Sequence, residues 1–425
     1  MRARARLPLT PIGPGRTVLV GATLIDGAAS APLPDAEVAV LDGVVDYAGP
    51  RRRGGVEDGG RVVDLSGSWM LPGFIDVHVH LAMVAAGGEQ QRAWFAEEAV
   101  LEVAAQLRRT VEAGVTTARD LDGLTPGYRL AVGNGTAVGP RLHLAIAMLS
   151  PTGGHADPFL PNGSLPAWAA RAGMPSPALV DTDDDIVRTV RRLISMGADA
   201  IKVSTSGGAG SPTDEPDDVG ITEQQVRLIR RLGDERGGVP VTAHALTDAA
   251  ARAAVQGGAA SIEHGYDLSD ATIELMLERG TVLVPTLSTL LREISTHIDP
   301  GRRRERERMR ERGMDSVRRA IAAGVPVALG TDAGVVPHGA NLRELAWLVE
   351  AGLTPIDAIR AGTSAGAELL GIGDRVGTVA AGKMADLVVT DADPLASVGR
   401  LAEPGAVRMV VQSGRAVVDL DRRLG

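Results

Sequence analysis

Four histidines, one lysine and one aspartate stand at the ends of short apolar segments, where their side chains could meet. The first two, His78 and His80, are separated by a single residue. Side chains alternate between the faces of a strand, so both imidazoles would project to the same side, together with Asp76. Two imidazoles at one strand end can chelate a metal ion. The other candidates each follow a later apolar segment: Lys202, His244, His264 and Asp332.

Each of these residues has a common structural explanation when it is taken alone. A single histidine is more often a hydrogen-bonded packing residue. A buried lysine or aspartate is unfavourable without an opposite charge. Both difficulties disappear if the groups share metal ions, and the chance convergence of so many ligand-type residues is improbable. The sequence therefore predicts a metal centre.

Lysine is rare in this chain, which has 44 basic residues of which only Lys202 and Lys383 are lysines. An ammonium group cannot coordinate a divalent cation. A lysine that has reacted with carbon dioxide carries a carbamate, which is an anionic oxygen ligand able to bridge two ions, whereas arginine cannot undergo this reaction. We therefore predict that Lys202 is a carboxylated ligand. Lys383 lies in an apparent turn, and we expect it to have a structural role.

Eight short apolar segments are predicted to be the strands that position these groups. Several of them follow a glycine that can close a helix in the left-handed conformation. Runs that are apolar on both faces suit buried parallel strands. Their alternation with helical patterns is typical of an α/β protein with a (β/α)8 TIM barrel, in which catalytic groups lie at the carboxyl ends of the strands. The predicted strands are 73–79, 115–117, 142–148, 198–203, 239–243, 259–262, 281–284 and 325–329, and the junction glycines are Gly114, Gly197, Gly258, Gly280 and Gly324.

The two ends of the chain differ from its middle. Residues 16–66 and 373–425 contain alternating strands broken by glycine turns, which predicts a small β-sandwich domain built from both termini. The expected division is 1–66 and 373–425 for the β domain and 67–372 for the metal-dependent barrel. The charged run at 301–314 predicts a solvated helix before the last barrel strand.

The composition argues against several other classes of protein. The chain has 425 residues, 44% of them hydrophobic, which is enough for a large core. A net charge of -9 without a cluster of basic and aromatic residues argues against a nucleic-acid partner. The lack of cysteine excludes disulfides, thiolate ligands and a cysteine nucleophile. No segment reaches 18 apolar residues, and the basic start lacks the apolar run of a signal peptide, so we expect no membrane partner and a cytoplasmic protein.

Several segments in a fixed order resemble the amidohydrolase superfamily of metal-dependent hydrolases over nearly the entire chain: LPGFIDVHVHL, IKVSTSGG, VTAHA, IEHG, LGTDAG and GTVAAGKMADLVV. Two more, IKVSTSGGAGSPTDEPDD and SPTGGHADPF, resemble its imidazolonepropionase-related branch, which includes Xaa-Pro and Xaa-basic dipeptidases and ochratoxin-cleaving amidases. The resemblance implies one metal on His78, His80 and Asp332, a second on His244 and His264, and carboxylated Lys202 bridging both.

The resemblance also implies an amide-cleaving mechanism. Zinc is the default metal for nitrogen and oxygen ligands, and manganese, cobalt or iron could replace it. Two ions about 3.5–4 Å apart would share a hydroxide that attacks the carbonyl of a small-molecule amide, such as a dipeptide or an N-acyl amino acid. Asp332 would take the hydroxide proton and pass it to the leaving amine. Homo-oligomers are common among the proteins that this chain resembles.

Three further residues are candidate substrate contacts. His155 follows the third strand, and its counterpart in the resembled branch faces the substrate, where it would donate a hydrogen bond to the carbonyl oxyanion or to a substrate carboxylate. Leu246 stands where the resembled dipeptidases carry a tyrosine, which argues against strict dipeptidase specificity. Tyr266 could supply the missing hydroxyl from the next strand. His338, after the last strand, is a further candidate for the substrate pocket.

A long proline-rich loop, residues 156–181, is either a lid or a linker. It contains Phe159 and Trp168, two of the few aromatic residues of the chain. Loops at the carboxyl face of a barrel commonly cover the site, which favours a lid, whereas the proline content is equally typical of a linker.

Two other classes of function stay open as alternatives. A mononuclear deaminase or cyclic-amide hydrolase, such as an imidazolonepropionase, would use related histidines and Asp332 but needs no carbamate. One metal per chain with an unmodified Lys202 would favour it. A metal-stabilised binding protein that has lost catalysis is the other alternative. Two bound metals without hydrolysis of any amide, ester or lactone would favour that protein, but all expected ligands and the acid/base aspartate are present.

Overall fold

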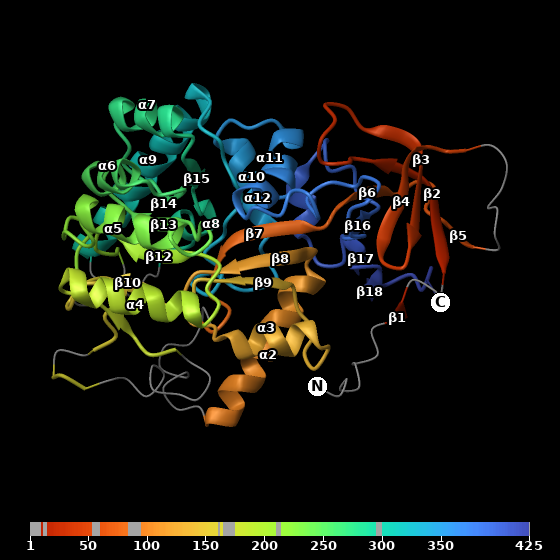
Figure 1. Cartoon of the computed structure of the whole chain (residues 1–425). Coiled ribbons are helices and arrows are strands. Elements are labelled where there is room, and N and C mark those ends of the chain that lie inside the picture. Colours follow the sequence, from red (N-terminus) through yellow and green to blue (C-terminus); the bar gives the residue numbers. More distant parts are fainter. Residues whose placement is uncertain are drawn as a thin grey trace.

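A computed structural model describes residues 10–11, 15–52, 60–83, 95–159, 162–164, 175–209, 214–294 and 300–424. Helices and strands alternate through the middle of the chain, and strands predominate near both ends (Figure 1). The protein therefore has the α/β architecture predicted from the sequence.

Strands from both ends of the chain form one nine-stranded sheet. Its first part is β1 (Thr10–Pro11), β2 (Arg16–Leu24), β3 (Leu33–Leu41), β4 (Val44–Pro50), β5 (Arg61–Asp64) and β6 (Trp69–Pro72), and its last part is β16 (Leu387–Thr390), β17 (Val407–Gln412) and β18 (Arg415–Asp419). Strand β6 joins the two parts because it pairs with both β2 and β16 (Figure 1, red and blue ribbons). The two segments that the sequence assigns to one β-sandwich domain thus form a single hydrogen-bonded sheet, and the division into domains stays a prediction.

Strand β6 also connects this sheet to the rest of the molecule. After Gly73 the chain continues directly into β7 (Phe74–Val79), which carries His78. The amide of Gly73 donates to the carbonyl of Asp386 at 2.8 Å, just before β16 begins. The strand that carries the histidine pair is therefore anchored at its start by the C-terminal part of the chain.

The middle of the chain contains two parallel sheets. The three-stranded sheet is β7, β8 (Val115–Asp120) and β9 (Arg141–Leu144), and the six-stranded sheet is β11 (Ala178–Leu179), β10 (Met148–Ser150), β12 (Ile201–Ser204), β13 (Val241–Ala245), β14 (Ser261–His264) and β15 (Val282–Val284). The predicted strand 142–148 is divided between β9 and β10, because the chain turns at Ile146, where φ is 73°.

The predicted strand 325–329 is an extended segment with one isolated bridge, between Leu283 and Val327. The amide of Leu283 donates to the carbonyl of Pro326 at 2.8 Å, and the amide of Val77 donates to the carbonyl of Leu329 at 2.9 Å. The segment thus lies between β15 and β7, in the order expected from the sequence. It is short because the chain turns again at Asp332, where φ is 57°.

The helices begin and end where local chemistry favours it. Threonine hydroxyls accept an amide at the starts of α4, α5 and α6. All five predicted junction glycines have φ between 64° and 100°, which suits residues that close a helix. The helices are α2 (Ala96–Glu112), α3 (Pro126–Gly133), α4 (Asp183–Ser195), α5 (Glu223–Asp234), α6 (Asp248–Gly257), α7 (Asp270–Arg279), α8 (Leu287–Leu290), α9 (Pro300–Ala323), α10 (Arg343–Glu350), α11 (Pro355–Ala361), α12 (Ser364–Leu369) and the 3-10 helix η1 (Val398–Ala402).

Helix α9 contains the charged run 301–314, which confirms the predicted helix. Within the described part of the chain, the helices all fall short of the length and apolar character needed to cross a membrane.

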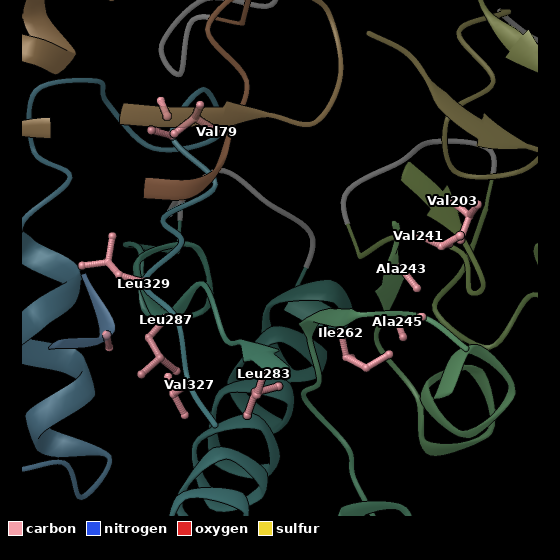
Figure 2. Packing of buried hydrophobic residues seen from close by; sticks show 14 of the residues in the cluster. Val79, Val203, Val241, Ala243, Ala245, Ile262, Leu283, Leu287, Val327 and Leu329 are labelled. Carbon is pink, nitrogen blue, oxygen red and sulfur yellow. The ribbon is translucent and has the colours of Figure 1, made fainter. Parts of the chain in front are cut away.

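The largest apolar cluster contains residues from neighbouring parallel strands, among them Val203, Val241 and Ile262 (Figure 2). These strands are buried on both faces. Because side chains alternate along a strand, the residues next to the clustered ones point to the opposite face. Lys202 and Glu263 are two of these residues, and both are fully buried. Because apolar side chains pack on one face of these strands, the polar side chains point into the interior on the other face.

Candidate metal centre

The six predicted ligands form one buried cluster. The imidazole centroids of His78 and His264 lie 5.1 Å apart, and those of His244 and His264 lie 4.6 Å apart. Ligand atoms of His78, His264 and Asp332 all lie within 4.8 Å of one another. The structure brings these side chains together in the interior, and their role as metal ligands stays a prediction. All six are at most 8% exposed: His78, His80, Lys202, His244, His264 and Asp332.

Burial keeps most of these histidines in the neutral form that binds metals. It lowers the pKa of His78 to about 4 and takes the pKa values of His244 and His264 well below the ordinary value. His80 differs. Burial alone would lower its pKa, but the hydrogen bond from its Nε2 to Oδ1 of Asp332 at 3.2 Å and the nearby carboxylates together raise the pKa to about 9. A cation between His80 and Asp332 would replace the proton that they share.

The carboxyl group of Asp332 is held in its ionised form. Burial alone would raise its pKa, but the hydrogen bond to His80 and the nearby His78 hold the pKa well below its usual range. Oδ2 of Asp332 also accepts a hydrogen bond from the Thr289 hydroxyl at 3.2 Å. The cluster therefore offers neutral nitrogen ligands and a carboxylate, which is a donor set that suits zinc and related metals.

A second contact orients each histidine ring. One ring nitrogen faces a protein group, which leaves the other for a metal ion, as in most metal-binding histidines. The contacts are His78 Nδ1 to Glu263 Oε2 at 2.7 Å, His80 Nδ1 to Asp122 O at 3.2 Å, His244 Nε2 to Gly207 O at 3.1 Å and His264 Nδ1 to Thr286 Oγ1 at 2.7 Å.

Glu263 is a site residue that the sequence analysis missed, although it lies in the IEHG segment. Its Oε1 accepts hydrogen bonds from Arg119 at 3.0 Å and from the hydroxyl of Ser261 at 2.7 Å. Arg119 also donates to the carbonyl of Val77 at 2.6 Å. Burial alone would raise the pKa of Glu263, but Arg119 and His78 hold it well below its ordinary value. A buried charged pair beneath the cluster therefore supports the ring of His78.

Lys202 has the environment expected of a residue that reacts with carbon dioxide. Its Nζ is buried without a hydrogen-bond partner among the described residues, and burial lowers its pKa to about 8. Lys383 instead donates to the carbonyl of Gly373 at 2.5 Å, which agrees with a structural role. Buried polar atoms without partners are rare, so the amine of Lys202 requires an explanation. A carbamate would provide two acceptor oxygens for cations and replace the buried amine by an anionic group.

His155 lies against the cluster, stacked on His244 with ring centroids 4.2 Å apart. Its Nδ1 lies 3.4 Å from Oδ2 of Asp214, and the same oxygen accepts the amide of Gly208 at 2.5 Å. A Cβ atom at Gly208 would overlap the imidazole of His155. Three neighbours therefore fix the ring beside the predicted metal ligands. The sequence analysis singled out neither Asp214 nor Gly208.

The substitution Gly208→Ala tests the position of His155. We expect the added methyl to displace the imidazole and to lower kcat/KM about 100-fold, because small misplacements of catalytic groups have effects of this size. The zinc content should not change. Steady-state kinetics and elemental analysis measure both quantities. Gly133→Ala is the matched control, since a Cβ atom there meets nothing within 4 Å. Normal kcat/KM in the Gly208→Ala enzyme would show that the reaction does not depend on the position of His155.

The other two substrate candidates are engaged by protein groups. The hydroxyl of Tyr266 donates to the carbonyl of Thr286 at 3.0 Å, and its ring lies 5.5 Å from that of His264. Nε2 of His338 lies 3.2 Å from the carbonyl of Met83, and burial lowers the pKa of His338 to about 4. A role in substrate binding stays a prediction for both.

The predicted lid or linker lies partly outside the described residues. Residues 160–161 and 165–174 are among those not described, and Trp168 is one of them. Phe159 is described and is 43% exposed. Leu246 is buried, so the position where the resembled dipeptidases carry a tyrosine presents an apolar side chain.

Residues 69–417 match the family model of the amidohydrolase family, and the chain belongs to this family. An ochratoxinase from Aspergillus niger is 30% identical over 368 residues, which cover 81% of this chain and 75% of that protein. An imidazolonepropionase from Myxococcus xanthus is 27% identical over 426 residues and covers 91% of each chain.

A solved structure extends the likeness to three dimensions. A prolidase complexed with N-methylphosphonate-L-proline superposes with a TM-score of 0.86 at 30% identity, covering 95% of this chain and 100% of that chain. The family predicted from the motifs is thus confirmed, and the protein is a hydrolase acting on amide C–N bonds.

Proposed function

We propose that this chain is a binuclear metal-dependent amidohydrolase that cleaves the amide bond of a dipeptide or an N-acyl amino acid, on a closed (β/α)8 barrel. Lys202 carries this proposal, because its amine is buried without a hydrogen-bond partner among the described residues. It also lies close enough to three of the predicted histidine ligands and to Asp332 to interact electrostatically with them. A mononuclear site would leave that amine without a role and without a partner.

The side chains form two groups that could each hold one cation. His78 and His80 point their Nε2 atoms at Oδ1 of Asp332, at 3.5 and 3.2 Å. His244 and His264 form the second group, and the ring of His264 lies close to both His244 and His78. Carboxylated Lys202 would bridge the two groups. Bound zinc ions would activate a water molecule and polarise the substrate carbonyl.

Two residues of the chain would handle the substrate and the proton. Asp332 is ionised and faces the ligand cluster, so it can take a proton from the attacking water and give it to the leaving amine. His155 is fixed beside His244 and can donate a hydrogen bond to the carbonyl oxygen or to a substrate carboxylate. One residue would thus bind an oxygen of the substrate, and the other would protonate the leaving nitrogen.

The relatives support the choice of substrate class. The prolidase was solved with a compound in which the nitrogen of L-proline is joined to a tetrahedral phosphonate, in the place where an amide would have its carbonyl carbon. The compound bound to that prolidase therefore contains an amino acid. We propose that the leaving group here is an amino acid, with the apolar Leu246 favouring a substrate other than a strict Xaa-Pro dipeptide.

Elemental analysis of protein purified with bicarbonate tests this proposal, together with a library of dipeptides and N-acyl amino acids. We expect two metals per chain and turnover of at least one compound. Asp332→Asn should lower kcat by about 10²–10⁴-fold, because it removes the proton acceptor. Asp374→Asn, at an exposed position, is the control. One metal per chain and no amide turnover would instead favour the mononuclear deaminase or cyclic-amide hydrolase.

A further inference from the structure

The turn after β15 contacts two of the predicted metal ligands. Oγ1 of Thr286 lies 2.7 Å from Nδ1 of His264, and the hydroxyl of Thr289 donates to Oδ2 of Asp332 at 3.2 Å. The hydroxyl of Tyr266 donates to the carbonyl of Thr286 at 3.0 Å. The conformation of this turn therefore sets the orientation of one ligand from each proposed metal group.

The conformation of the turn is unfavourable by itself. Thr286 has φ 48° and ψ 47°, a left-handed conformation that β-branched residues rarely adopt. Helix α8, which follows, has only four residues, and the first amides of a helix have no partner within it. Strained backbone of this kind persists only where its surroundings hold it in place.

Glu344, at the start of α10, supplies that support. The side chain is fully buried, and its two oxygens accept the amides of Leu287 at 2.7 Å and Ser288 at 2.6 Å. Burial raises the pKa of Glu344 to about 7, because the two hydrogen bonds offset only part of the unfavourable burial of a carboxylate. Glu344 is distant from the turn in the sequence and contacts it only in the folded chain.

We propose that Glu344 is a positioning residue of the metal centre, which holds the turn of residues 286–289 so that Thr286 and Thr289 orient His264 and Asp332. This inference rests on the proposed function, since both side chains must be metal ligands. Glu344 itself contacts the backbone of the turn. Its effect on metal binding is therefore transmitted through the two threonines.

The substitution Glu344→Gln separates positioning from packing. Glutamine has nearly the same volume, so the apolar surroundings of Glu344 are preserved. Only one of its two terminal atoms can accept a hydrogen bond, and the amide nitrogen would face the backbone amide of Leu287 or Ser288. Two hydrogen-bond donors that face each other repel, so the turn must shift. Thr286 and Thr289 would shift with the turn.

The test compares the zinc affinity of the full chain and of Glu344→Gln by competition with a chromogenic chelator. We expect the affinity to fall about 10- to 100-fold, the range typical of residues that orient metal ligands. The visible spectrum of the cobalt-substituted protein should change, because His264 and Asp332 change their angles to the ion. Asp386→Asn is the matched control. Asp386 is buried, accepts the amide of Ser413 at 2.7 Å and pairs with Arg141, and none of the described contacts of the ligands involves its side chain. The Asp386→Asn substitution should lower Tm without altering zinc affinity or the cobalt spectrum.

A second variant keeps the test decisive if Glu344→Gln does not fold. Thr289→Val removes one of the two contacts through which Glu344 acts, and we expect weaker zinc binding at an unchanged Tm of the metal-free protein. In the double variant, the two losses should be less than additive. Normal zinc affinity in the folded Glu344→Gln or Thr289→Val protein, or full additivity, would overturn the inference. A wild-type chain that binds no zinc would instead overturn the proposed function.

Discussion

Replacing Lys202 by methionine should remove nearly all amide hydrolysis and at least one of the two proposed metals, with the fold intact. Methionine fills a similar volume but cannot form a carbamate. The loss of a bridging ligand should lower kcat/KM by more than about 10³-fold, because both activation of water and polarisation of the carbonyl depend on the ions. The metal-free protein should keep its Tm or gain stability, since the substitution removes a buried amine that has no hydrogen-bond partner in the described part of the chain.

Lys383→Met is the matched control for this experiment. Lys383 is the only other lysine of the chain, and it bonds to a backbone carbonyl outside the ligand cluster. Activity and metal content should be normal in this variant.

Short carboxylic acids should partly restore the activity of a Lys202→Ala enzyme, because they can fill the cavity left by the smaller side chain with an anionic oxygen ligand. Two metals and full activity in Lys202→Met would show that the site needs no carbamate.

The substitution Glu263→Gln should produce the largest loss of stability. It leaves the guanidinium of Arg119 buried without its counter-charge, and removal of one partner from such a pair costs about 3–5 kcal/mol. The ring of His78 also loses its carboxylate partner, so zinc affinity should fall about 10- to 100-fold. Urea denaturation of the metal-free protein measures the first effect, and chelator competition measures the second.

The double variant Glu263→Gln with Arg119→Met distinguishes these two effects. Removing both charges should restore much of the stability, because a neutral buried pair has no uncompensated charge. Zinc affinity should stay low, since His78 still lacks the carboxylate. The exposed pair of Arg303 and Glu307 provides the comparison, and Glu307→Gln should change stability by less than about 1 kcal/mol. A similarly small change in Glu263→Gln would mean that the buried pair is screened by solvent.

The ligand cluster could be predicted from the sequence because it depends on local rules. Side chains alternate along a strand, parallel strands end at one face, and polar residues at those ends therefore meet. His78, His244 and His264 follow these rules. Lys202 could be recognised because lysine is rare in this chain and because only an amine can form a carbamate.

The supporting residues could not be predicted because their partners are set by the folded backbone. Glu344 contacts a turn that is distant in the sequence, and nothing near it along the chain indicates that contact. The supporting role of Arg119 could not be predicted from its own strand. The partner of a charged residue in an apolar run is set only when the strands are in register. The sequence predicts a β domain shared by both ends of the chain, but it does not predict that β6 is the strand that pairs with β16.

The pairing of β6 with β16 has a consequence for the order of events during biosynthesis. The ribosome releases β6 and β7 early, whereas β16 emerges only after all six predicted ligands have been synthesised. Until then β6 lacks one of its neighbours, and the histidine pair follows a strand that is not yet anchored. All six ligands of a nascent chain are therefore present before the strand that anchors the first two. Capture of the proposed metals should thus follow the emergence of β16, and truncations that stop before Leu387 should leave the protein without them.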